Sequence, residues 1–279
     1  MTESAYNFEM IDVVTDGGVA WATISNPPVN VITLSLFGEL TRLAVTVESD
    51  DNVRVLVLKS ANPDFFLAHF DVTAILGFPI EGEARRSPDN PYHQMCERFR
   101  LMDKVTVAQV EGRVGGGGSE LISAFDMRFG VQGKTVINQM EVPVGILPGG
   151  GGTQRLPRML GRGRALEVIL GGIDLDAETA EKWGYLNRAL PANEIGGFVD
   201  ALARRIARHP PEAVRLAKRA VNAADLPLAE GLVEEAYLFD VLLRTPEATP
   251  AMKRFMELGG QTPEGESRVA ELVEGILED

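Results

Sequence analysis

Two runs of four consecutive glycines restrict the folds open to this chain more than any other feature. The first lies in GRVGGGGSELISAFD, which spans Gly112 to Asp126, and the second lies in LPGGGGTQRLPRML, which begins at Leu147. Ordering glycine costs more conformational entropy than ordering any other residue. A strand-like segment enters the first run and an apolar, helix-like segment leaves it. We therefore interpret this run as an ordered loop and not as a flexible linker.

The common glycine-rich motifs do not fit either run. A P-loop needs a lysine where Gly118 stands, and a dinucleotide fingerprint needs a third glycine where the two runs have Glu120 and Gln154. A nucleophile elbow around Ser119 needs a closing glycine in place of Leu121. Three scattered histidines and one cysteine predict no metal site.

Glycines directly before a helix leave unpaired N–H groups at the positive end of the helix dipole. The first run therefore predicts an oxyanion-binding loop, with Glu120 in the first turn of the following helix. Spacing alone leaves open whether Glu120 takes part in chemistry or only complements the helix dipole.

Composition narrows the class of protein. With 279 residues and 45% hydrophobic content, the chain can bury a large core. A net charge of −13 argues against a nucleic-acid partner. The single cysteine, Cys96, predicts a reducing compartment, and we expect it to be half-buried. The N-terminus lacks the features of a signal peptide and no apolar run is long enough for a membrane span, so we expect a cytoplasmic protein.

Hydrophobic periodicity predicts repeated strand–strand–helix units followed by a helical region. Alternating apolar residues favour strands in VAWATI, VRVLVLKS and KVTVAQV, while LSLFGELTRLAVTVES has helical spacing. We place the domain boundary between residues 1–209 and the all-helical residues 210–279. Residues 79–90 are rich in proline, glycine and charge, which predicts a mobile loop.

Five separated blocks resemble the crotonase (enoyl-CoA hydratase/isomerase) superfamily. NPPVNVIT resembles the family's N-terminal strand and turn, and FFLAHFDV resembles its F-x-A-G-x-D loop. GRVGGGGSELISAFD is similar to G-x-x-x-G-G-G-x-E-L-x-x-x-x-D, and MEVPVGILPGGGGTQRLPRMLG to P-E-x-x-x-G-x-x-P-G-x-G-G-T-x-R-L. DAETAEKWGYLNRALP matches A-x-x-A-x-x-x-G-L-V less tightly. The resemblance covers nearly the whole chain and implies an α/β fold, the crotonase/ClpP-like spiral of ββα units. It also implies a C-terminal trimerisation region in a homotrimer or a dimer of trimers.

The same resemblance implies an enoyl-CoA hydratase that acts on an acyl-CoA thioester, with coenzyme A as part of the substrate and no separate cofactor. The backbone N–H groups of Phe70 and Gly117 would form the oxyanion hole. Glu120 would activate water and Glu141 would protonate C2, or the two would share both roles. The alternatives are another reaction of the superfamily (isomerase or acyl-CoA hydrolase) and a catalytically idle acyl-CoA-binding member.

Residues that would bind the acyl-CoA follow from the matching blocks. They are Val29, Val31, Ala68, His69, Phe70, Asp71, Val72, Gly116, Gly117, Met140 and Gly149. His69 replaces the family's glycine; histidine tolerates positive φ, so we expect it to keep the loop shape, or else to donate to the ligand. Met140 replaces a proline, and we expect Asp126 to have a structural hydrogen-bonding role.

Two basic residues that often contact the CoA phosphates in the family are absent from this sequence. Val29 and Thr73 stand where relatives often carry lysine or arginine. Lys253 and Arg254 of the C-terminal helices, from the same or a neighbouring subunit, are candidate replacements, with ordinary exposed charges as the alternative. We interpret the arginines between Arg155 and Arg164 as a solvated or inter-subunit face, with CoA attraction as the second reading.

Overall fold

The structure is a computed structural model, and it describes residues 6–83 and 86–277. The chain divides into two compact units, residues 1–204 and 205–279, so the division falls inside helix α8 (Ile195–Arg208). Residues 1–5, at the start of the predicted leaderless N-terminus, lie outside the described part. No helix among the described residues is both long and apolar enough to cross a membrane.

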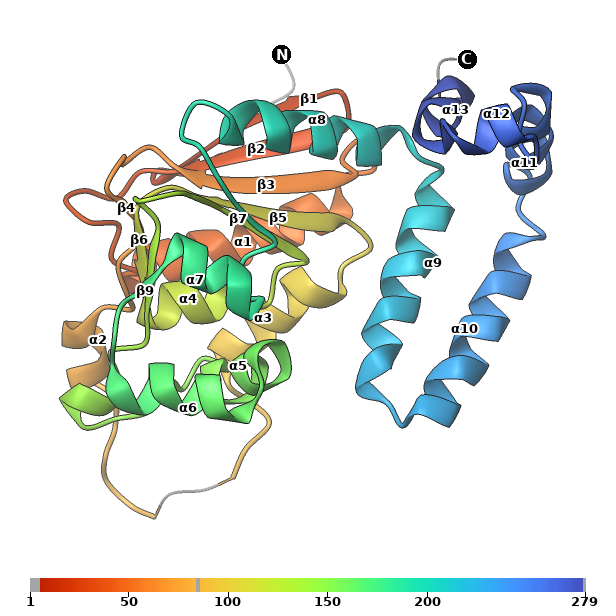
Figure 1. The fold of residues 1–279 in the computed structure, drawn as a ribbon. Coiled ribbons are helices and arrows are strands. Elements are labelled where there is room, and N and C mark those ends of the chain that lie inside the picture. The colour runs from red at the N-terminus through yellow and green to blue at the C-terminus, as the bar shows by residue number, and fades with distance from the viewer. Residues whose placement is uncertain (1–5, 84–85, 278–279) are drawn as a thin grey trace. The chain divides into compact units, whose positions relative to one another are not determined.

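A six-stranded sheet forms the framework of the first unit (Figure 1). Its strands, in spatial order, are β1 (Ile11–Asp16), β2 (Val19–Ile24), β3 (Val55–Ser60), β5 (Val105–Val110), β7 (Met127–Val131) and β10 (Arg188–Leu190). The first two strands form an antiparallel hairpin and the others are parallel. All six residues of β5 are buried, as expected for a parallel strand that is covered on both faces.

A second, four-stranded sheet is formed by short strands. Its spatial order is β4 (Phe65–Leu67), β6 (Arg113–Gly115), β8 (Val136–Asn138) and β9 (Leu175–Asp176). Each of the strands β3, β5 and β7 thus leads into a short strand of this sheet and then into helices. The predicted spiral of ββα units is confirmed. Gly112 permits the turn from β5 into β6, because its φ is +83° and a Cβ there would lie 2.3 Å from the Asp64 carbonyl oxygen.

The helices of the first unit cover these sheets. They are α1 (Leu34–Ser49), α2 (Val72–Leu76), α3 (Pro91–Leu101), α4 (Gly116–Ile122), the 3₁₀ turn η1 (Val142–Val144), α5 (Gly152–Leu160), α6 (Arg162–Gly171), α7 (Ala177–Trp183) and α8. Thr33 caps α1 by accepting a hydrogen bond from the Leu36 N–H. Phe198 of α8 contacts Phe129 of β7, which seats α8 against the large sheet (Figure 1).

Two predictions about this unit need comment. Cys96 lies wholly buried in α3, not half-buried, because its face of the helix packs into the core. Residues 79–90 contain no helix or strand in their described part; residues 84 and 85 lie outside it, and the mobility of this loop stays a prediction.

The second unit is helical throughout its described residues. Beyond the end of α8 it contains α9 (Pro211–Asn222), the 3₁₀ turn η2 (Ala223–Asp225), α10 (Leu228–Leu242), α11 (Ala248–Glu257), α12 (Pro263–Glu266) and α13 (Val269–Ile276). Helices α9 and α10 form a hairpin, joined by an ion pair of 2.7 Å between Arg219 and Glu234.

Candidate active site

A cavity of about 530 Å³ in the first unit brings most of the predicted site together. It is lined by Leu34, Phe37, His69, Phe70, Val72, Ile75, Phe78, Asn90, Pro91, Tyr92, Gly116, Gly117, Glu120, Met140, Glu141, Val144, Ile146, Leu147, Gly149 and Gly150. Most of these side chains are apolar, and the two glutamates are the only acidic residues among them. Both glycine runs contribute to the wall, as the sequence predicts.

The first glycine run lies at the junction of β6 and α4. The helix begins at Gly116, so three of the glycines form its first turn and Glu120 lies in the second turn. The prediction that Glu120 lies in the first turn was wrong. Glycine is needed inside the helix because a Cβ at Gly118 would lie 2.6 Å from the Cβ of Leu67 on the neighbouring strand.

The backbones of Phe70 and Gly117 lie close together at the cavity wall. A Cβ on Gly117 would lie 3.1 Å from the Phe70 Cβ and 3.4 Å from the Phe70 backbone nitrogen. Gly117 is the second residue of α4, where the N–H has no acceptor within the helix. Among the described residues, the Phe70 N–H donates to no backbone acceptor. Two N–H donors from neighbouring backbone segments at an apolar cavity can bind an oxygen that carries negative charge.

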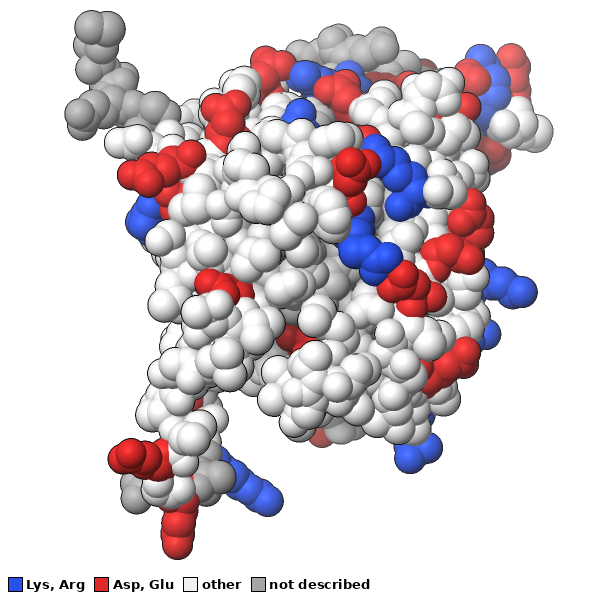
Figure 2. Space-filling view, turned by 90° about the vertical axis from the view of Figure 1, so that its left-hand side faces the viewer, with Lys and Arg blue, Asp and Glu red and all other residues white. Residues whose placement is uncertain are grey.

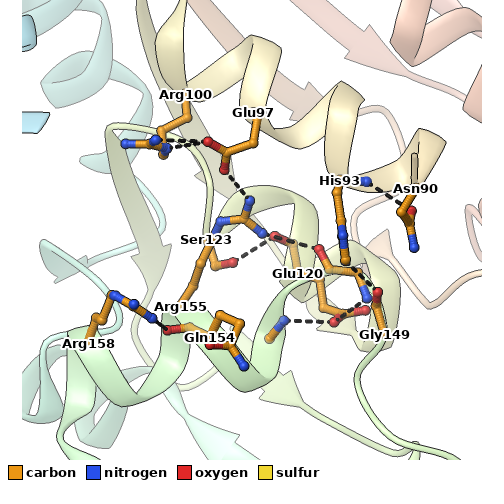
Figure 3. Close-up of polar contacts among 12 residues, drawn as sticks. Asn90, His93, Glu97, Arg100, Glu120, Ser123, Gly149, Gln154, Arg155 and Arg158 are labelled. Atoms are coloured by element: carbon orange, nitrogen blue, oxygen red, sulfur yellow. Dashed lines mark hydrogen bonds and ion pairs between the residues drawn. The ribbon is translucent and has the colours of Figure 1, made fainter. Parts of the chain in front are cut away.

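Glu120 is a buried carboxyl held by the second glycine run. Its Oε1 accepts hydrogen bonds from the N–H groups of Gly150 and Gly152, each at 2.8 Å (Figure 3). The pKa of Glu120 is raised to about 7, mainly by burial and partly by the nearby Glu141, against the lowering effect of the two N–H donors and Arg155. At neutral pH this group can therefore accept or release a proton.

Glu141 lies between β8 and η1 and is 7% exposed. Its Oε1 lies over the start of α4, 3.1 Å from where a Cβ on Gly116 would be. Burial raises the pKa of Glu141 as well. Two buried carboxyl groups that repel each other titrate as a pair, and one keeps its proton where an isolated carboxyl would be ionised.

Arg155 of α5 supports the second glycine run. Its guanidinium donates to the Gly150 carbonyl oxygen at 3.2 Å and pairs with Glu97 of α3 at 2.7 Å (Figure 3). The Arg155 side chain is only 15% exposed, so it does not lie on a solvated face; the inter-subunit alternative for this arginine cluster stays a prediction. Arg164, in contrast, lies on the ring of Trp183.

Aromatic side chains form one wall of the cavity. The rings of Phe37 and Tyr92 stack at 5.7 Å, and Phe70 meets Tyr92 edge-on at 5.8 Å. The Tyr92 hydroxyl donates to the Gly117 carbonyl oxygen at 2.6 Å. His93, the next residue on α3, hydrogen-bonds the Gly149 carbonyl oxygen at 2.7 Å.

Sequence reasoning missed Tyr92, Gly150, Gly152 and Arg155. The glycine run after Leu147 was the one available signal, because bare N–H groups close to a buried carboxylate are natural donors. Nothing in the local sequence marks Tyr92.

Four predicted binding residues do not line the cavity: Val29, Val31, Ala68 and Asp71. Ala68 and Asp71 flank the lining residues His69 and Phe70 in sequence; the Ala68 N–H donates to the Val29 carbonyl oxygen at 3.3 Å, and Asp71 caps α2.

His69 lines the cavity, but its φ is not positive; Asn30 and Gln261 are the non-glycine residues with positive φ in the described part of the chain. The expected reason for tolerating histidine was therefore wrong. The His69 ring hydrogen-bonds the Phe70 carbonyl oxygen at 2.8 Å. Asp126 accepts hydrogen bonds from the Thr106 N–H and hydroxyl at 2.8 and 3.1 Å, which is the predicted structural contact.

The candidate partners of the CoA phosphates, Lys253 and Arg254, lie on α11 in the second unit, and their role stays a prediction. On the face shown in Figure 2, Lys and Arg side chains are interspersed with Asp and Glu and form no continuous basic patch.

The enoyl-CoA hydratase/isomerase family model matches residues 15–262. A short-chain-enoyl-CoA hydratase of Clostridium acetobutylicum is 29% identical over 245 residues, which cover 87% of this chain and 92% of that protein. Among solved structures, the enoyl-CoA hydratase of Bacillus anthracis is 27% identical with a TM-score of 0.81, covering 89% of this chain and 96% of that one. Pseudomonas aeruginosa DspI is 28% identical with a TM-score of 0.82, covering 92% and 97%. The chain therefore belongs to the enoyl-CoA hydratase/isomerase family, within the crotonase superfamily.

Proposed function

We propose that the chain is an enoyl-CoA hydratase, which adds water across the 2,3 double bond of an enoyl-CoA thioester to give a 3-hydroxyacyl-CoA. One observation carries the proposal: two buried carboxyl groups, Glu120 and Glu141, line the same apolar cavity as the closely packed residues Phe70 and Gly117.

The two N–H groups bind the thioester carbonyl oxygen. Negative charge grows on this oxygen as water attacks C3, so donors that are already in place stabilise the transition state more than the substrate. Losing one such donor costs about 2.7–4 kcal/mol of barrier.

The two glutamates supply the acid and the base. Glu120 takes a proton from water as the water oxygen bonds to C3, and the backbone donors from Gly150 and Gly152 support the carboxylate needed for this step. Glu141 gives its proton to C2. After one turnover Glu120 holds a proton taken from water, whereas the proton of Glu141 is on C2. A proton transfer from Glu120 to Glu141, directly or through the next water, restores the pair.

The acyl group lies against the aromatic wall formed by Phe37, Phe70 and Tyr92. Coenzyme A enters as part of the substrate and no other cofactor takes part. Lys253 and Arg254 remain the candidates for its phosphates.

A homotrimer or dimer of trimers is the proposed assembly. Apolar side chains are exposed along α10: Leu228 is 78%, Val233 70% and Phe239 63% exposed in the single chain. Contacts with further copies would remove this surface from water.

The test is loss of the enoyl-thioester absorbance with crotonyl-CoA and longer 2-enoyl-CoA substrates, together with identification of the product. Formation of 3-hydroxyacyl-CoA is expected. Conversion of a 3-enoyl-CoA to the 2-enoyl form without hydration would replace the proposal with an isomerase, and release of free CoA would replace it with a hydrolase. Tight binding without turnover would identify a catalytically idle member.

A further inference from the structure

Three buried polar side chains form a chain behind Glu141. Gln139 and Ser119 are fully buried and Tyr185 is 1% exposed. They come from β8–η1, α4 and the segment after α7, so three distant parts of the sequence meet at this point. None of them lines the cavity, and the proposed reaction does not yet use them.

The Gln139 amide links Glu141 to Ser119. With its nitrogen toward Glu141, the amide donates to Oε2 at 3.0 Å and to Oε1 at 3.2 Å, and its oxygen accepts from the Ser119 hydroxyl at 2.9 Å. The opposite orientation turns the amide oxygen toward both oxygens of the carboxyl group. That arrangement is repulsive when Glu141 is ionised, so the hydrogen-bond network assigns the first orientation to the carboxylate form.

Tyr185 determines where the Ser119 proton points. The two hydroxyl oxygens are 2.7 Å apart. A serine hydroxyl has one proton, and when Ser119 donates it to Gln139 its oxygen accepts from Tyr185 in the 2.7 Å contact. The Ser119 carbonyl oxygen, at 3.2 Å, is the more distant second acceptor of the Tyr185 proton. Burial raises the pKa of Tyr185 to about 12, so its hydroxyl stays protonated and can donate throughout the neutral range.

We infer that Ser119 and Tyr185 are positioning residues that orient the Gln139 amide as a hydrogen-bond donor to the Glu141 carboxylate. In this series Tyr185 donates to Ser119, Ser119 donates to Gln139, and Gln139 donates to Glu141. The role in turnover rests on the proposed function, since it concerns the carboxylate that Glu141 becomes when it protonates C2.

The hydrogen bonds from Tyr185 through Ser119 and Gln139 offset the cost of burying the Glu141 carboxylate. Burial raises the pKa of Glu141, and a donor to the ionised form acts in the opposite direction. Without such a donor, the pKa of Glu141 would be higher still and the release of its proton to C2 less favourable. Tyr185 stands where the A-x-x-A-x-x-x-G-L-V segment has leucine, a side chain that cannot donate.

Other titratable groups face this carboxyl pair. Glu120 on α4 repels the Glu141 charge, Tyr92 on α3 and His69 before α2 line the same cavity, and Arg155 on α5 attracts Glu120. At the far end, buried Arg128 donates to the Tyr185 carbonyl oxygen at 2.7 Å. The test variants leave all of these groups in place.

The experiment is a pH titration of the ligand-free protein with ¹³C-labelled glutamate carboxyl groups, followed by NMR. Glu141→Gln identifies the Glu141 resonance. In Ser119→Ala, the midpoint of Glu141 should rise by about 0.5–1 pH unit, because the amide oxygen loses the donor that fixes its orientation. In Tyr185→Phe, a smaller rise is expected, since the Ser119 proton is then free to turn to a helix carbonyl. Ser123→Ala is the matched control: Ser123 lies one turn further along the helix, is also buried, and donates to the Glu120 carbonyl oxygen (Figure 3).

An unchanged midpoint in Ser119→Ala would overturn the inference. A lower midpoint would also overturn the inference, because the hydrogen bonds through Ser119 would then stabilise the protonated form of Glu141. The pH profile of kcat with crotonyl-CoA is the second readout and should shift in the same direction. If the titration shifts as expected but no enoyl-CoA is turned over, the inference stands and the proposed function fails.

Discussion

Tyr92 donates a 2.6 Å hydrogen bond to the carbonyl oxygen of Gly117. Helix α3 is thereby tied to the residue whose N–H we propose as an oxyanion donor. The same tyrosine ring stacks on Phe37. One side chain thus connects the proposed oxyanion hole to the aromatic wall of the cavity.

Tyr92→Phe keeps the ring and removes the hydroxyl. We expect kcat to fall about 3- to 10-fold with KM nearly unchanged, because a less fixed Gly117 peptide weakens binding of the transition state more than of the substrate. Steady-state kinetics with crotonyl-CoA measure this. Tyr6→Phe is the control, since the Tyr6 hydroxyl bonds Asp50 and does not line the cavity. Equal kcat in both variants would show that the Gly117 contact does not matter for turnover.

Gly117→Ala tests the oxyanion hole directly. The new methyl group would lie 3.1 Å from the Phe70 Cβ and 3.3 Å from the Tyr92 hydroxyl, so Gly117 and Phe70 must move apart. A loss of about 100- to 1000-fold in kcat is expected, as for removal of one oxyanion donor. Gly163→Ala is the control, because nothing lies within 4 Å of its Cβ position on α6. It should keep full activity and gain up to about 1 kcal/mol of stability.

The sequence predicted the ββα order and the meeting of Phe70, Gly117, Glu120 and Glu141. These features leave local marks: alternating apolar residues for strands, and glycine wherever two backbones approach closely. The family blocks then supplied the spacing between them.

Contacts between distant side chains left no such mark. Tyr92 and Gly117 are 25 residues apart, and Arg155 and Glu97 are 58 apart. Arg155 sits in a helical stretch rich in arginine, which resembles a solvated face until the acidic partner on α3 is known. Glu120 was placed one turn too early because glycine normally disfavours a helix interior, whereas here it is required by the proximity of Leu67.

Replacing Glu120 should separate stability from activity. In the folded chain the Glu120 carboxyl keeps its proton up to a pKa of about 7, against an ordinary value of 4.5. Its contribution to stability is therefore complete below pH 4.5 and is lost as the pH rises through about 7. Neutral Glu120→Gln should be more stable than the original chain at pH 8, by about 1–3 kcal/mol, and no more stable at pH 4.

Urea unfolding at the two pH values measures this difference, and Glu167→Gln, an exposed position on α6, is the control. In the same preparations, Glu120→Gln and Glu141→Gln should each lower kcat by about 100- to 10,000-fold. Near-normal turnover in either variant would rule out the two-carboxyl mechanism.

If the exposed apolar side chains of α10 form contacts between copies, a charged residue placed among them should weaken the oligomer. Val233→Glu should reduce the mass measured by light scattering after size exclusion, because a carboxylate buried at a contact between copies is costly. Glu235→Gln, exposed on the same helix, should leave the mass unchanged. A monomeric original chain would contradict the proposed trimer.

Arg155→Gln tests whether Arg155, beside the second glycine run, lowers the pKa of Glu120, the proposed general base. The change removes the ion pair with Glu97 and the bond to the Gly150 carbonyl oxygen, and with them a positive charge that lowers the pKa of Glu120. The pKa of Glu120 should therefore rise, and the acidic limb of kcat/KM should move to higher pH, with kcat at pH 7 about tenfold lower. Arg158→Gln, an exposed arginine one turn further along α5, should keep the original limb. A parallel fall in kcat at every pH would instead mean that Arg155 only holds the loop in place, since a purely geometric defect leaves the titration of Glu120 where it was.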